Sequence, residues 1–253
     1  EELIPFEKNG EGVNGYVNAP DWMPMCTFTT MVGFMYKLCG FQVYFHTVPY
    51  DEKPKWLFTM GDEPLWNNKG EFPAAFVNGK GWVSDSEVLI KYLKDEYPER
   101  YAKIACPPNV EPMRFHGAKM FGMHIPFMKG DATFAETVAK MEAELFIPFE
   151  EMVSTSLYIK GNDGPCEADV RFFAFATCVN MLGLNLQGES YIPEKYTNIY
   201  KFMERMYTNP AFQNVNGYQH IPPISTIALL NTKFGKMGMK MIDAKGPASP
   251  PVD

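Results

Sequence analysis

The sequence predicts an α/β domain followed by an all-helical domain. Strand-type and helix-type segments alternate up to about residue 104, whereas amphipathic helical patterns take over beyond residue 105. A chain of 253 residues, 46% of them hydrophobic, is also long enough to form two ordinary cores. The predicted divisions are an amino-terminal extension, the α/β domain, the helical domain and a carboxy-terminal extension, at 1–12, 13–104, 105–230 and 231–253.

The first half of the α/β domain reads as strand, helix, strand. A short apolar-alternating piece around Val13–Val17 is followed by a proline-containing loop. From Thr27 onward, apolar residues recur every three or four positions until Gly40, which predicts a helix ended by that glycine. Residues 42–48 are rich in β-branched and aromatic side chains, and Pro49 closes this second strand.

The second half of the α/β domain reads as a hairpin and a helix. An apolar strand over 72–77 leads into Asn78–Gly79, a dipeptide that tolerates the positive φ of a type I′ turn, and then into Trp82–Val83. Ser84, Asp85 and Ser86 are capping residues that open a helix extending towards Pro98. A β-α-β unit followed by a β-β-α unit is the thioredoxin-type arrangement.

The remaining sequence predicts a helical bundle and a tail. Helical periodicity covers four segments, 113–128, 134–153, 168–184 and 198–206. Residues 231–253 combine lysines with a Gly-Pro-Ala-Ser-Pro-Pro run, and such a composition cannot bury enough apolar surface to fold alone. We therefore expect an extension at this end.

Composition excludes several classes of function. A formal charge of -7 and a pI near 5.2 argue against nucleic acid or an anionic membrane as the main partner. The longest apolar runs, such as 172–176, are too short for a membrane span. Five separated cysteines without a C-x-x-C pair, and four histidines without ligand spacing, predict neither a metal site nor a disulfide framework. A reducing compartment, the cytosol or a plastid, fits best.

Four motifs resemble one family. They are Ala19-Pro20-Asp21, Cys26-Thr27-Phe28, Glu52-Lys53-Pro54-Lys55-Trp56 and Trp82-Val83-Ser84-Asp85-Ser86. Together they resemble the dehydroascorbate reductases of the glutathione transferase superfamily, which are related to chloride intracellular channel and omega-class proteins. The resemblance covers roughly Val13 to Val215. It implies a thioredoxin-like glutathione-binding domain followed by a glutathione-transferase-type helical bundle.

The resemblance implies that Cys26 is a catalytic nucleophile. A cysteine at a helix amino terminus lies at the positive end of the helix dipole, which lowers the thiol pKa and favours the thiolate. Such a thiolate would reduce dehydroascorbate, or another small electrophilic or disulfide substrate, with glutathione as co-substrate through a mixed disulfide. The alternative is a buried, inert cysteine.

Five further residues match the glutathione site of the family. Phe72 and Pro73 match the cis-proline position that pairs with the cysteinyl part of glutathione, although a trans proline at a strand edge is the alternative. Asp85 and Ser86 match the pair that holds the γ-glutamyl end, and plain helix capping is their other reading. Lys53 matches a lysine near the glycyl carboxylate, but it could equally be a surface lysine.

The surroundings of Cys26 differ from the family pattern and keep a second function open. Met25 and Thr27 replace the usual Asp and Pro, and Met31 replaces an arginine. Loss of a nearby cation removes electrostatic support for a thiolate. In the alternative, the protein is catalytically weakened and serves as a binding or structural subunit of a larger complex, for instance an organellar one. It would then bind its protein partners through the two extensions.

Overall fold

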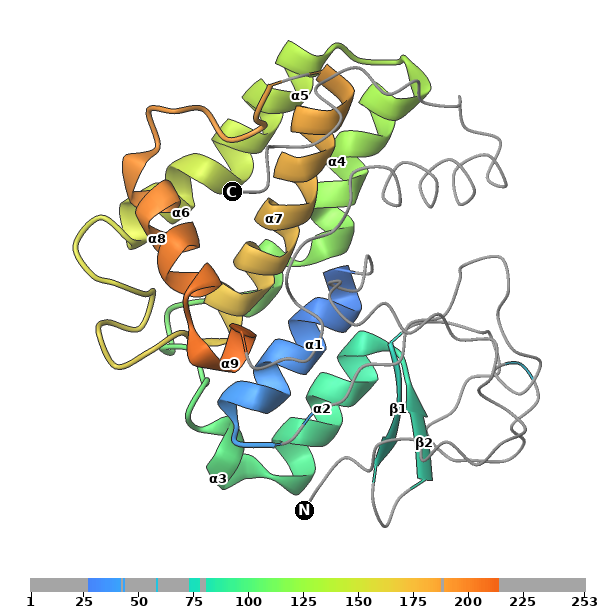
Figure 1. Cartoon of the computed structure of the whole chain (residues 1–253), viewed down its shortest axis with the longest axis vertical. Coiled ribbons are helices and arrows are strands. Elements are labelled where there is room, and N and C mark those ends of the chain that lie inside the picture. Colours follow the sequence, from blue (N-terminus) through green and yellow to red (C-terminus); the bar gives the residue numbers. More distant parts are fainter. Residues whose placement is uncertain are drawn as a thin grey trace. The chain divides into compact units, whose positions relative to one another are not determined.

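A computed structural model describes residues 27–41, 43, 58, 73–77, 81–187 and 189–213 (Figure 1). Contacts divide the chain into two compact units. The first takes in the described residues up to Ile104 together with Pro210–Gln213, and the second runs from Ala105 to Asn209. The predicted strands around 13–17 and 42–48 lie wholly or mostly outside the described residues, as do both predicted extensions.

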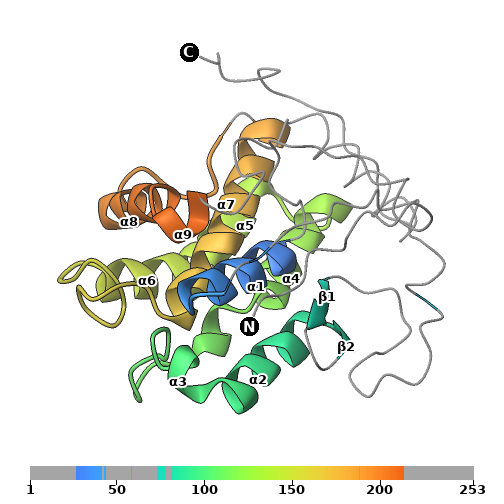
Figure 2. The ribbon, with the colours of Figure 1, turned by 60° about the horizontal axis from the view of Figure 1, so that its bottom comes forward.

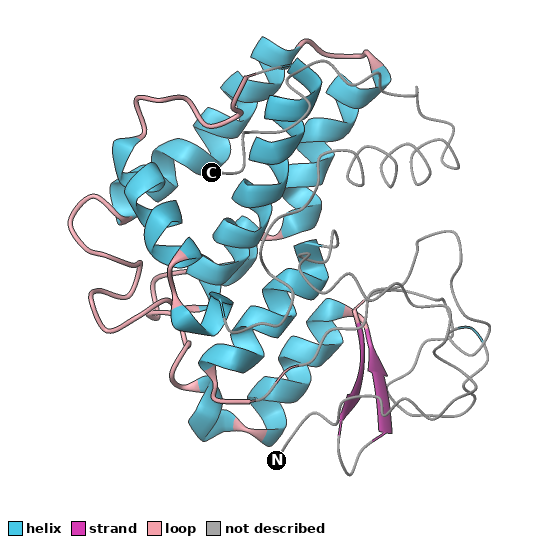
Figure 3. Ribbon diagram, viewed as in Figure 1, coloured by secondary structure: helices cyan, strands magenta, loops and turns pink. Residues whose placement is uncertain are grey.

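The first unit contains a hairpin and helices. Its elements are α1 (Thr27–Leu38), β1 (Ala74–Val77), β2 (Gly81–Ser84), α2 (Ser86–Glu96), α3 (Pro98–Tyr101) and α9 (Pro210–Gln213). Figure 3 shows the hairpin as the paired strands. The hairpin followed by α2 is the β-β-α part of the predicted thioredoxin-like domain.

Helix α1 ends where the sequence predicts. Gly40 has a φ of 84°, a left-handed conformation that glycine adopts without a Cβ clash. Its N–H donates to the Lys37 carbonyl, and the Phe41 N–H donates to the Tyr36 carbonyl, at 2.9 and 3.0 Å. The rings of Tyr36 and Phe41 also pack together, with centroids 5.4 Å apart. These features form a Schellman motif, which satisfies the last carbonyls of the helix.

The predicted hairpin is present. Strands β1 and β2 are antiparallel, with Phe76 opposite Trp82 and Val77 opposite Gly81. Residues 78–80, which join the last paired positions, lie outside the described residues, so the turn type at Asn78–Gly79 stays a prediction.

Helices α1 and α2 pack against each other in the first unit. The buried hydroxyl of Tyr36 donates a 2.8 Å hydrogen bond to the carbonyl of Leu89. In Figures 1 and 2 the two helices lie side by side and run in the same direction, so that their amino termini are at the same end. Any group placed at the start of α1 therefore lies on the same side as the start of α2.

The secondary structure described in the second unit consists of helices and an isolated bridge between Tyr158 and Gly161, joined by loops. Its elements are η2 (Pro112–Phe115), α4 (Gly117–Lys129), α5 (Phe134–Met141), the π-helical turn η3 (Glu142–Phe146), α6 (Ile147–Met152), α7 (Glu167–Gln187) and α8 (Thr197–Tyr207). Helix α5 begins with a capping box, in which Thr133 and Glu136 exchange hydrogen bonds. The π turn ends two residues before Pro148, whose ring would meet the carbonyl four residues earlier in a regular helix.

Aromatic side chains fill the core of the second unit around α7. The ring of Phe172 stacks on Phe149, with centroids 3.5 Å apart and planes at 6°. Phe115 and Phe202 contact this stack at their edges. All four side chains are fully buried. An aromatic cluster of this kind supplies much of the apolar area that a helical bundle buries.

His124, in α4, is buried against the rings of Phe127 and Tyr191. The Nδ1 atom of His124 is 2.8 Å from the hydroxyl of Tyr191, and its Nε2 atom has no hydrogen-bond partner among the described residues. Burial lowers the pKa of His124 from 6.5 to about 4. The folded chain therefore keeps a neutral imidazole at a pH where an unfolded chain would protonate it.

We expect His124 to make folding sensitive to acid. Between pH 6.5 and about 4 the unfolded state binds a proton that the folded state does not, so the free energy of unfolding falls as the pH falls through this window. The loss amounts to about 3 kcal/mol. Urea unfolding at pH 7 and pH 4 should show that His124→Phe loses less stability than the wild type. An equal loss in both proteins would contradict this role.

That comparison also separates His124 from Asp169, whose effect has the opposite sign. Burial raises the pKa of Asp169 from 3.8 to about 6. Its folded form therefore binds protons more tightly than the unfolded form, and stability falls as the pH rises from about 4 to 6. The wild type and His124→Phe both retain Asp169, so the contribution of Asp169 cancels when their losses of stability are compared.

Candidate functional site

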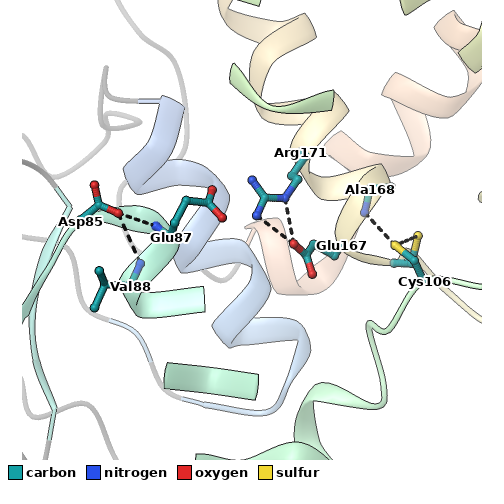
Figure 4. A network of polar contacts seen from close by, with 8 residues as sticks. Asp85, Glu87, Val88, Cys106, Glu167, Ala168 and Arg171 are labelled. Atoms are coloured by element: carbon teal, nitrogen blue, oxygen red, sulfur yellow. Dashed lines mark hydrogen bonds and ion pairs between the residues drawn. The ribbon is translucent and has the colours of Figure 1, made fainter. Parts of the chain in front are cut away.

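The junction between β2 and α2 carries two of the predicted site residues. Asp85 is the N-cap of α2, and its Oδ1 atom accepts hydrogen bonds from the N–H groups of Glu87 and Val88, at 2.8 and 3.3 Å (Figure 4). Ser86 is the first residue of the helix and is buried. A carboxylate, a hydroxyl and the positive end of a helix dipole are therefore combined within a few residues.

The structure joins Pro73 to this junction. The N–H of Asp85 donates a 3.0 Å hydrogen bond to the carbonyl of Pro73, which is buried directly before β1. The antiparallel hairpin produces this contact, because Ala74 pairs with Ser84 and the residues flanking that pair are brought together. Three of the six predicted site residues, Pro73, Asp85 and Ser86, thus lie at one place.

The backbone of Asp85 is strained. Its φ of 80° makes it the sole non-glycine residue with a positive φ in the described part of the chain. Such a conformation costs a non-glycine residue about 1–3 kcal/mol and persists only where surrounding contacts hold it. Here the side-chain cap to Glu87 and Val88 and the backbone bond to Pro73 hold it. Strain of this kind is concentrated at binding and catalytic sites.

The other three predicted residues, Cys26, Lys53 and Phe72, lie outside the described residues. Helix α1 begins at Thr27, which directly follows Cys26 in the chain. Met31 is fully buried in α1, at the position where the family pattern has an arginine. None of the described residues groups three or more His, Cys, Asp or Glu side chains in a way that could hold a metal ion. None of the described helices is long and apolar enough to cross a membrane.

A second polar cluster lies at the start of α7. Its segment Cys166–Asp169 resembles the buried capping box of the family's helical domain, but the sequence analysis did not single out Arg171. Arg171 and Glu167 form an ion pair with Nη2 and Nε 2.8 and 2.9 Å from the same carboxylate oxygen, and their side chains are 0% and 1% exposed (Figure 4). Their spacing of four residues is a usable signal, because it places both on one helix face. Their burial was not expected, because arginine and glutamate side chains are mostly exposed in folded proteins.

The same helix start also brings two cysteines together. The Sγ atoms of Cys106 and Cys166 are 3.2 Å apart, although 60 residues separate them in sequence. The carboxylate of Asp169 accepts hydrogen bonds from the N–H groups of Cys166, at 2.8 Å, and Ile159, at 3.1 Å. In the segment from Cys166 to Asp169, the side chain of the third helical residue thus bonds back to the N–H of the capping residue, which is one of the two hydrogen bonds of a capping box. No sequence signal connects this segment with Cys106.

Comparisons with known proteins support one family. Residues 110–210 match the family model of the glutathione S-transferase C-terminal domain. Glutathione S-transferase DHAR2 of Arabidopsis thaliana is 24% identical over 212 residues, which cover 81% of this chain and 90% of that protein. Probable glutathione S-transferase DHAR4 of the same plant is 21% identical over 211 residues, covering 77% and 86% of the two chains.

Solved structures show the same fold. A dehydroascorbate reductase from Chlamydomonas reinhardtii has a TM-score of 0.62 at 19% identity, and the match covers 85% of this chain and 93% of that one. A glutathione transferase homologue from Lodderomyces elongisporus, solved with two GSH per subunit, has a TM-score of 0.50 at 15% identity, covering 76% and 94%. Residues 110–210 therefore have a glutathione S-transferase C-terminal domain, the solved structures show the fold of the chain, and over most of its length the chain is similar to the plant dehydroascorbate reductase-type glutathione transferases.

Proposed function

We propose that this protein is a glutathione-dependent thiol transferase of the dehydroascorbate reductase type, with Cys26 as its single nucleophile. The observation that carries the proposal is the strained cap of Asp85, which is hydrogen-bonded to Pro73 and followed by Ser86. A helix could be capped without a positive φ, since capping residues ordinarily have an extended backbone. The strain therefore supports a function for the Asp85 carboxylate beyond capping.

The chemistry of this junction suits the γ-glutamyl end of glutathione. That end carries an ammonium and a carboxylate on one carbon atom. The carboxylate of Asp85 would attract the ammonium, while the hydroxyl of Ser86 and the amino terminus of α2 would attract the carboxylate. The backbone of Phe72, which precedes Pro73, would pair with the cysteinyl part of glutathione. Lys53 would attract the glycyl carboxylate. A glutathione transferase homologue of the same fold contains GSH.

The reaction needs one thiolate and two glutathione molecules. The Cys26 thiolate adds to a carbonyl carbon of dehydroascorbate, and the sulfur of a first glutathione then attacks the Cys26 sulfur. Ascorbate leaves with the bonding electrons, and a mixed disulfide between Cys26 and glutathione remains. A second glutathione attacks this disulfide, which releases oxidised glutathione and restores the Cys26 thiolate. The sum is one dehydroascorbate reduced and two glutathione molecules oxidised.

The start of α1 supports this role for Cys26. A thiol there gains from the helix dipole, which favours its ionised form. Met31 supplies no charge to the thiolate, so we expect a weaker activation than an arginine would give. A compartment that keeps thiols reduced, the cytosol or a plastid, would supply the glutathione, and one relative, DHAR3 of Arabidopsis thaliana, is described as chloroplastic.

Asp85 offers a test of the glutathione site. Asparagine can still cap α2 and tolerates a positive φ, but it lacks the negative charge. We expect Asp85→Asn to raise KM for glutathione about tenfold, the effect of one lost charge-assisted hydrogen bond, with little change in stability. Steady-state kinetics and urea unfolding measure the two effects. Asp85→Ala, which loses both cap and charge, should also lose about 1 kcal/mol of stability.

The direct experiment combines adduct mapping with turnover. The purified protein is incubated with oxidised glutathione, the site of any mixed disulfide is located by mass spectrometry, and glutathione-dependent reduction of dehydroascorbate is followed in parallel. An adduct at Cys26 together with turnover supports the proposal. Absence of an adduct at Cys26 would overturn it, whereas glutathione binding without turnover, and stable co-purification with other chains, would favour a binding subunit.

A further inference from the structure

The Cys106–Cys166 pair lies in the second unit and takes no part in the proposed transferase reaction. Cys166 directly precedes α7 and is fully buried, whereas Cys106 is half-buried. Figure 4 shows Cys106 beside the start of α7, with one dashed line to the N–H of Ala168 and another between the two sulfur atoms. Their separation of 3.2 Å exceeds an S–S bond of about 2.05 Å by roughly 1.2 Å, so a small side-chain movement would bring them to bonding distance.

Hydrogen bonds distinguish the two sulfurs. The two Sγ atoms share one S–H···S hydrogen bond of 3.2 Å, and the N–H of Ala168 donates to the Cys106 sulfur, at 3.3 Å. Ala168 belongs to the first turn of a 21-residue helix, whose amino terminus favours negative charge. The hydrogen bond with Cys166 lowers the pKa of the Cys106 thiol, against the opposing effects of burial and of the nearby Glu167 and Asp169. The same bond, with burial, raises the pKa of Cys166.

Helix capping alone does not account for this pair. Cys106 satisfies the Ala168 N–H, a role that an N-cap side chain usually fills. Sulfur is a weak hydrogen-bond acceptor, and a serine or threonine at position 166 would cap the helix better. The arrangement instead resembles a reactive cysteine with a resolving cysteine next to it. The Cys106 sulfur has a lowered pKa and is partly accessible, whereas the adjacent Cys166 sulfur is protonated.

We propose that Cys106 and Cys166 form a dithiol that hydrogen peroxide oxidises to an intramolecular disulfide. The Cys106 thiolate attacks one peroxide oxygen, the O–O bond breaks, and Cys106 becomes a sulfenic acid while hydroxide takes up a proton and leaves as water. The sulfur of Cys166 then attacks the sulfenic sulfur, which forms the S–S bond and releases a second water. Two thiols are oxidised by one peroxide, and two thiols such as glutathione would reverse the step.

Peroxide is the oxidant that fits the geometry. Cys106 is only partly exposed and Cys166 is closed to solvent, so a small, uncharged oxidant can reach the first sulfur more easily than a tripeptide disulfide can. The second step needs no access, since Cys166 already touches its target. The pair is thus a modification site with an attacking and a resolving cysteine.

The test uses the full chain carrying Cys26→Ser, so that chemistry at Cys26 cannot contribute. After treatment with hydrogen peroxide, the protein is digested without reductant and searched by mass spectrometry for a peptide linked between Cys106 and Cys166. We expect this linked peptide, and we expect dithiothreitol to abolish it. The proposal would be overturned if both thiols stay free although peroxide oxidises other residues of the chain or is still present in excess.

Two variants separate the roles. With Cys166→Ser, we expect no disulfide and a sulfenic acid at Cys106 that dimedone traps. With Cys106→Ser, peroxide should oxidise Cys166 at least about tenfold more slowly than in the parent. Equal oxidation of Cys166 in parent and variant would contradict an attacking role for Cys106. Cys39→Ser, at the end of α1, is the control and should leave the linked peptide unchanged.

Serine retains a hydrogen-bonding group at both positions, so we expect these variants to fold, and circular dichroism would check this. Should either variant fail to fold, mapping of the linked peptide in the parent still decides the proposal. The transferase proposal depends on adduct formation at Cys26 in the wild-type chain, so either proposal can fail while the other holds.

Discussion

Replacing Cys26 with serine is expected to lower glutathione-dependent reduction of dehydroascorbate by at least about a thousandfold. A serine hydroxyl does not ionise near neutral pH and cannot form a mixed disulfide, so both halves of the proposed cycle are lost. Initial rates at saturating glutathione measure the effect. The serine side chain is close in size to cysteine, and therefore urea unfolding should change little.

The matched control for this variant is Cys178→Ser, in α7 of the second unit. It should retain turnover, because its sulfur is not part of the proposed site. Retention of more than about a tenth of the wild-type rate by Cys26→Ser would show that another group is the nucleophile. Loss of turnover in both variants would point to damage of the fold rather than to chemistry.

The second large effect is expected at the buried ion pair of α7. Arg171→Met leaves the carboxylate of Glu167 without its cation in a place closed to water, where the two charges are now 2.8 Å apart. We expect a loss of about 3–5 kcal/mol in the free energy of unfolding, since an unpaired buried charge is costly. Urea unfolding monitored by circular dichroism measures the loss.

A double variant and an exposed pair make this test specific. Arg171→Met combined with Glu167→Leu removes both charges and should recover much of the lost stability, because apolar residues often replace a buried ion pair without penalty. Lys119→Ala breaks a partly exposed pair with Glu144 and should have little effect. A double variant as unstable as Arg171→Met would indicate that packing of the arginine, and not charge, is decisive.

Local signals in the sequence predicted the ends of several elements. Gly40 ends α1, Asp85 caps α2, and the helical segment predicted over 134–153 corresponds to α5, η3 and α6 in succession. These features depend on a few neighbouring residues, so a short window contains the information.

Contacts between distant residues could not be predicted in this way. Nothing in the sequence near Cys106 indicates that its sulfur meets Cys166, and the positive φ of Asp85 is visible only in the structure. The family resemblance pointed to Pro73 and Asp85 separately, whereas the hydrogen bond between them follows from the hairpin register. Cys26, Lys53 and Phe72 stay predictions, because they lie outside the described residues.

The positive φ of Asp85 has a consequence for how this position can vary among descendants of the chain. One base substitution turns an aspartate codon into a glycine codon, and glycine would relieve about 1–3 kcal/mol of backbone strain. Proteins are held only slightly above the stability that their function requires, so such a gain would be readily accepted where the carboxylate had no use. Aspartate at position 85 would then mark lineages in which ligand binding is still under selection, and glycine would mark those that have lost it.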